Sequence, residues 1–137
     1  MKHLFYFLFG LLLLAGCSKD KKDDPTPKTP AEAIAGLYTM TSITTGGTQI
    51  TLPFAGLNGV KMTGTVNVVA MAGKQDETNL TLTLRITGMA DTSGGGLVQV
   101  KAAGTGYDLF ENGQKLGTVV GNTLTVTDGN DIIVAQK

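Results

Sequence analysis

The amino-acid sequence predicts an all-β domain with antiparallel strands over residues 31–137. Most of this stretch alternates apolar and polar residues with a period of two, as a strand with one buried face does. The clearest case is 80–87, where Leu80, Leu82, Leu84 and Ile86 share one face. Gly, Asn and Asp residues separate these segments, and the connections are too short for the crossover helices that parallel strands require. Antiparallel hairpins are therefore expected.

The first elements of the domain are a short helix and a pair of strands. Pro30 to Ala35 suits a helix of one or two turns, with Thr29 as its N-cap and Gly36 as its stop. The segments 37–44 and 48–52 form a strand pair around Gly46-Gly47. A loop is expected at 53–59, followed by a long strand over 60–71 in which Gly64 marks a bend or bulge.

The second half of the domain is a run of short hairpins. After the strand at 80–87, the residues 88–96 are expected to form a flexible loop because they contain Gly94-Gly95-Gly96. Asn112-Gly113 is the strongest hairpin signal, because both residues readily accept the positive φ angles of a type I′ turn. The strands expected here are 97–101, 107–111, 114–120, 123–127 and 131–135.

Eight or nine such strands must protect their edges, either by closing into a barrel or by stacking as a sandwich. The stretch 33–43 (a short helix, Gly, the aromatic Tyr38, then an alternating strand) resembles the opening of lipocalin-like lipoprotein domains. The segments 121–128 and 132–134 resemble their closing hairpin, although the family usually has Trp where Tyr38 stands. The resemblance implies an up-and-down barrel of about eight strands whose interior binds an apolar ligand. A β-sandwich is the alternative.

The N-terminus has the pattern of an export signal. Lys2 and His3 precede an apolar run from Leu4 to Leu14, which as a helix spans roughly 20 Å and is too short to cross a bilayer. Leu13-Leu14-Ala15-Gly16-Cys17 then resembles the lipobox of bacterial lipoproteins. We therefore expect residues 1–16 to be a removed signal peptide. An ordinary signal peptide with a coincidental Cys, or a short anchor helix, is the alternative.

The lipobox predicts that Cys17 is the lipid attachment site. Its sulfur would carry a diacylglycerol thioether and its new amino group an acyl chain such as palmitate, which together give stable membrane anchoring. Residues 17–30 contain a Lys/Asp cluster and Pro25, Pro27 and Pro30, which is typical of an extended, solvated tether. The cluster also resembles the signal that exports some lipoproteins to the outer cell face. The expected location is the outer membrane. The Lys/Asp cluster has two open interpretations: a signal for display on the cell surface, or a plain charged linker.

Composition excludes several function classes. The chain has no net charge, and the domain over 31–137 has eight acidic and six basic side chains, so nucleic acid is not an expected partner. A single Cys, a single His and no Trp exclude a disulfide framework and a Cys-rich zinc site. No residues form a catalytic motif, and neither enzymatic activity nor a cofactor is expected.

The acidic residues of the domain are expected to be surface groups. Asp76 and Glu77 are adjacent and point apart, and Asp108 and Glu111 lie on opposite faces of one strand. The sequence Asp128-Gly-Asn-Asp131 fits a hairpin turn better than a calcium loop, because the chain ends before the twelfth-position Glu of an EF-hand.

Two functions follow from the sequence as expectations. The first is a lipid-anchored barrel that binds a small apolar ligand, for which Met40, Met62, Met71 and Met89 provide either an adaptable lining or ordinary core filling. The second is a structural or partner-binding module of the envelope, in which a filled barrel presents its Thr-rich face or the loops 53–59 and 88–96 to another envelope protein. An apolar cavity of ~300 Å³ or more favours the first function, and a filled interior favours the second.

Overall fold

A computed structural model describes residues 28–137. The predicted signal peptide (1–16), the lipid attachment site Cys17 and most of the predicted tether lie outside the described residues. The described chain begins with helix α2 (Pro30–Ile34). Thr29 Oγ1 accepts a hydrogen bond from the backbone N–H of Glu32, and the Glu32 carboxylate accepts one from the backbone N–H of Thr29. This reciprocal capping box, with Pro30 in the first turn, explains why so short a helix forms there.

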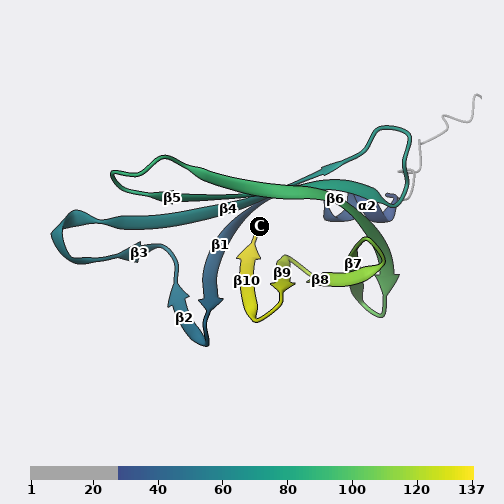
Figure 1. The fold of residues 1–137 in the computed structure, drawn as a ribbon. Coiled ribbons are helices and arrows are strands. Elements are labelled where there is room, and N and C mark those ends of the chain that lie inside the picture. The colour runs from purple at the N-terminus through teal and green to yellow at the C-terminus, as the bar shows by residue number, and fades with distance from the viewer. Residues whose placement is uncertain (1–27) are drawn as a thin grey trace, which may run out of the picture.

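The rest of the domain is one continuous antiparallel sheet that closes on itself (Figure 1). Eight strands form the ring in the order β1-β10-β9-β8-β7-β6-β5-β4, and the ring closes where Gly36–Thr39 of β1 pair with Thr65–Val68 of β4. The barrel expected from the sequence is therefore confirmed, and the fold is not a sandwich. The ten strands are β1 (Gly36–Thr45), β2 (Thr48–Thr51), β3 (Phe54–Ala55), β4 (Lys61–Ala70), β5 (Glu77–Ile86), β6 (Thr92–Ala103), β7 (Gly106–Glu111), β8 (Gln114–Val120), β9 (Thr123–Asp128) and β10 (Asp131–Gln136).

Two of these strands, β2 and β3, do not belong to the ring. Beyond Thr39 and Thr65, β1 and β4 diverge, and β2 then pairs with β1 while β3 pairs with β4. The predicted loop at 53–59 therefore contains a short strand and a 3-10 turn. Figure 1 shows β4 and β5 running well beyond the short strands β7 to β10 on the left of the view.

The end of the barrel that carries α2, called the packed end below, is closed and filled. Ala31 and Ile34 of α2 are buried, and the helix lies against β4 and β6. Tyr38 is fully buried below the helix, where its hydroxyl donates a hydrogen bond to the Ile34 carbonyl oxygen at 2.7 Å. The Lys137 ammonium lies 5.0 Å from the centre of the Tyr38 ring. The buried side chains around them are Val66, Val68, Leu80, Val98, Val100, Leu109, Val119, Leu124 and Ala135.

Two bulges change the alternation of side chains around the ring. Met40 pairs with Ala135 and Ser42 with Val134, so Thr41 is an extra residue whose hydroxyl donates to the Val134 carbonyl oxygen. A second extra residue, Leu116, stands on β8 between the pairs that Gly117 and Lys115 make with β7. Each bulge shifts the phase of its strand by one residue, as an inserted residue must.

The turns confirm one prediction and contradict another. Asn112 and Gly113 have φ angles of 50° and 81°, as the expected β7–β8 hairpin requires. The expected loop at 88–96 is wrong, because β6 already begins at Thr92 and Gly94-Gly95-Gly96 pair with Leu82-Thr81-Leu80 of β5. A Cβ on Gly95 would overlap the Leu80 carbonyl oxygen, so the glycine permits close strand contact rather than flexibility.

Candidate ligand-binding site

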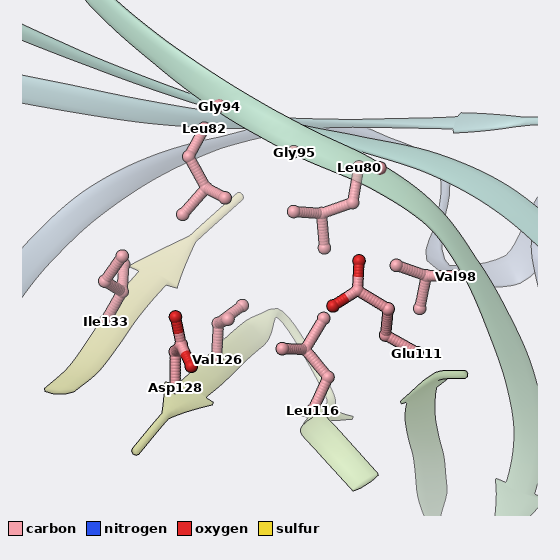
Figure 2. A pocket seen from close by; sticks show the side chains of 11 residues that line it. Leu80, Leu82, Gly94, Gly95, Val98, Glu111, Leu116, Val126, Asp128 and Ile133 are labelled. Atoms are coloured by element: carbon pink, nitrogen blue, oxygen red, sulfur yellow. The ribbon is translucent and has the colours of Figure 1, made fainter. Parts of the chain in front are cut away.

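A cavity of about 310 Å³ lies inside the barrel at the end opposite α2, called the open end below (Figure 2). This end carries the β5–β6, β7–β8 and β9–β10 turns. The wall of the barrel is incomplete here, because β6 pairs with β7 only from Gln99 onward and Thr92–Val98 pair with β5 alone. The cavity is lined by Leu80, Leu82, Gly94, Gly95, Gly96, Val98, Glu111, Leu116, Val126, Asp128 and Ile133.

Glycines on β6 produce the space. Because side chains alternate across a strand, the positions that share the inner face with Val98 are Gly96 and Gly94. A Cβ built on Gly94 meets no atom within 4 Å, so the position faces open space. A Cβ on Gly96 would lie 3.1 Å from Oε1 of Glu111. The cavity therefore exists where two successive inward positions carry no side chain.

Apolar side chains form most of the remaining wall. Leu80 and Leu82 project from β5 on one side, and Val126 and Ile133 come from β9 and β10 on the other (Figure 2). Leu116 completes the wall because the bulge on β8 turns it inward next to Gly117. Such a concave, mainly apolar surface with a few polar groups is typical of small-molecule sites.

Two carboxylates are the charged groups of this wall. Figure 2 shows the Glu111 side chain reaching into the cavity between Leu80 and Leu116, and the Asp128 carboxylate beside Val126 and Ile133. Glu111 ends β7 and Asp128 ends β9, so both residues start from the rim, where the strands turn, and the Glu111 carboxylate extends inward as far as Gly96. Neither carboxylate forms an ion pair with another side chain of residues 28–137.

The acidic residues compared in the sequence separate in space. Asp108 lies on the outer face and pairs with Lys115 at 2.8 Å, whereas Glu111 lines the cavity, so the predicted opposite faces are found. Glu77 pairs with Lys74. Asp128 and Asp131 stand directly opposite one another in the β9–β10 hairpin. Within residues 28–137 no group of three or more His, Cys, Asp or Glu side chains is arranged to hold a metal ion.

The methionines do not form the lining that the sequence suggested as one option. Met40 is buried in the core, where its sulfur occupies the space that a Cβ on Gly64 would need. Met62 packs against the core, and Met71 and Met89 are exposed. The sequence reasoning missed Gly94, Gly96, Glu111 and Asp128 as cavity residues. Extending the alternation of 97–101 backward by four residues would have placed the two glycines on the inner face.

A second hollow, of about 340 Å³, lies beside α2 between Thr29, Glu32 and the β4–β5 turn. Its walls are mostly exposed turn residues on the outside of the barrel. Because it lacks an apolar interior, the inner cavity is the better candidate for a ligand site.

Comparisons of the chain with protein-family models, with curated proteins and with solved structures found no match. In the part of the chain that the structure describes, no helix has the length and apolar character needed to cross a bilayer.

Proposed function

We propose that the protein is a lipid-anchored envelope lipoprotein whose barrel binds a small apolar ligand at its open end. The observation that carries the proposal is the 310 Å³ cavity, whose inner wall combines glycines with leucine, isoleucine and valine side chains. Removing apolar ligand surface from water is worth about 25 cal/mol per Å², and a concave site covers more of a ligand than a flat surface does.

The barrel keeps the core that stabilises the fold and the surface available to a ligand at opposite ends. The packed end holds the fold through Tyr38, Leu109 and Leu124, which are fully buried. The open end leaves Leu82, Leu116 and Ile133 only half-buried, so these side chains retain apolar surface for a ligand to cover. A ligand would therefore enter without displacing the core.

Native mass spectrometry of the full chain, purified gently from its own host, tests ligand binding. The control is the variant Gly94→Leu, whose new side chain would extend into the cavity, compared with Ser93→Leu on the outer face of the same strand. We expect a small-molecule adduct on the wild type and on Ser93→Leu, and none on Gly94→Leu. The same adduct on Gly94→Leu, or none on the wild type under any gentle condition, would contradict the proposal.

Membrane attachment through Cys17 belongs to the same proposal and rests on the lipobox-like sequence 13–17. Replacement of Cys17 by Ser removes the sulfur that would carry the diacylglycerol. Cell fractionation should then find the protein released from the membrane, because a single remaining apolar segment of this length does not span a bilayer. An unchanged membrane-bound fraction would show that Cys17 is not the anchor.

One observation favours a second candidate, a partner-binding role. The tip formed by the β3–β4 and β5–β6 turns exposes Leu57 to 90% and Met89 to 69%. The backbone N–H of Thr87 donates to the Lys61 carbonyl oxygen at 2.9 Å, so the two turns lie together. Exposed apolar side chains grouped in this way often mark protein contacts. A protein that co-purifies with the wild type but not with a Leu57→Ser/Met89→Ser variant would support this role.

A further inference from the structure

Resting on the proposed function, we propose that the ligand is an amphipathic cation: an apolar body that carries a primary ammonium or a similar positive group at one end. The cavity is apolar inside and acidic at its rim, and the two parts select the two ends of such a molecule.

The apolar part of the site comes from the floor of the cavity. Leu80, Val98 and Val126 lie deep among core side chains and are buried, so an inserted alkyl or aromatic group meets hydrocarbon there. Gly94 leaves room beside Leu82, its partner on β5. Leu80, Val98 and Val126 offer no hydrogen bond, so a polar end placed against them and away from Glu111 would lose its hydration without replacement.

The charged part comes from Glu111 and Asp128. Both carboxylates line the cavity, and none of the described residues that line it is Lys, Arg or His. The closest basic residue along the β7–β8 hairpin is Lys115, whose ammonium is already bound 2.8 Å from Asp108 on the outer face. The cavity therefore presents two carboxylates that form no ion pair with a side chain of residues 28–137. Lys115 lines a neighbouring hollow of about 150 Å³ with both of them, but its ammonium is bound to Asp108.

A third carboxylate adds to this field. Asp131 is the direct cross-strand partner of Asp128, and like charges in that position repel each other. A cationic group at the rim would relieve this repulsion, whereas an anionic group such as a fatty-acid carboxylate would increase it. The acidic rim should therefore make amphipathic cations bind more tightly than simple fatty acids, although both have apolar bodies that fit the floor.

Three probes with the same apolar body test the charge preference: octylammonium, octanol and octanoate. The full chain is held in phosphatidylcholine nanodiscs, which carry no net surface charge, and the unfolding midpoint is measured against probe concentration, since a ligand that binds the native state raises it. We expect octylammonium to bind about fivefold tighter than octanol, the effect expected of two exposed ion pairs, and octanoate to bind more weakly than octanol. The preference should shrink at high salt.

Charge variants assign the preference to the rim. In Glu111→Gln/Asp128→Asn, octylammonium and octanol should bind within about twofold of each other. Asp91→Asn is the control for a change of charge outside the cavity, because Asp91 pairs with Arg85 there and its loss removes one of the protein's negative charges without touching the rim. That variant should keep the preference.

The outcomes separate the two proposals. If octanol or octanoate binds the wild type as tightly as octylammonium, or if the preference survives in the double variant, the inference is wrong. The proposed function survives those results as long as Gly94→Leu weakens all binding. If no probe shifts the midpoint of the wild type, the proposed function itself fails.

Discussion

The two ends of the barrel are built from the same strands, but one end is filled with side chains and the other encloses a cavity. At the packed end, α2 closes the ring over Tyr38, and the interior is filled by valine and leucine side chains with almost no exposed surface. At the open end, β6 loses its partner β7, and a cavity of about 310 Å³ replaces the core (Figure 2). The ends therefore differ in their covering helix, in the pairing of β6 and in the side chains that face inward.

The inner face of β6 shows how the change is made. From the packed end to the open end its inward positions are Val100, Val98, Gly96 and Gly94. The first two are buried and fill the interior, and the last two leave it empty. Four alternate residues on one strand therefore set where the core ends and the cavity begins, which shows that a barrel can gain a cavity by omitting side chains.

Two truncations of leucine to alanine, one at each end of the barrel, should give the largest difference in the free energy of unfolding. Leu124→Ala removes a fully buried side chain at the packed end and should lower the free energy of unfolding by about 2–5 kcal/mol. Leu82→Ala removes the same atoms from the cavity wall, where Leu82 is half-buried, and should cost about 1 kcal/mol or less. Equilibrium unfolding in urea measures both. Equal losses would mean that the open end is packed as tightly as the other.

Alanine substitutions at two neighbouring glycines of β6 should give the next largest difference in stability. Gly95→Ala forces a Cβ onto the Leu80 carbonyl oxygen at a φ angle of 154°, and should destabilise the fold by about 1–3 kcal/mol. Gly94→Ala places its Cβ in open space and should change stability by less than ~0.5 kcal/mol. Thermal unfolding of the two variants distinguishes them, and the reverse order would contradict the described geometry of the cavity wall.

The smallest expected effect concerns the helix that closes the packed end. Thr29→Ala removes the oxygen that accepts from the Glu32 backbone N–H, and should cost about 1 kcal/mol. Ser93→Ala at the open end removes an exposed hydroxyl contact with Thr83 and should cost less than ~0.5 kcal/mol. Urea midpoints that fall equally in both variants would show that α2 contributes no more than a surface contact.

The sequence predicted the parts of the fold that depend on local patterns. The alternation of Leu80 and Leu82, the Asn112-Gly113 turn and the Thr29 cap each arise within a few residues, and each is found as expected. The family resemblance implied a ligand-binding interior, but the residues that line the cavity were not predicted, because they come together only through the pairing of six strands. The register that sets Gly94 opposite Leu82 shows that three consecutive glycines form a strand and not a loop.

The roles of the candidate site residues also depend on strand pairing and so could not be predicted from local sequence patterns. Glu111 and Asp128 are separated along the chain, and in the sequence Glu111 looks like an ordinary surface residue of a strand and Asp128 like a turn residue. They line one cavity because β7 and β9 both end at the open end of the ring. The bulge that turns Leu116 inward is equally hidden, since it follows from the pairing of β8 with β7.

Amide hydrogen exchange of the full chain, with and without the octyl probe that binds most tightly, tests the central claim that one end holds the fold and the other binds. We predict slow exchange at the packed end that the probe leaves unchanged. We also predict faster exchange in β6 near Gly94–Gly96 and in the turns after Glu111 and Asp128, slowed by the probe. Probe protection centred on α2 and Tyr38, or exchange equally slow at both ends without the probe, would contradict the account.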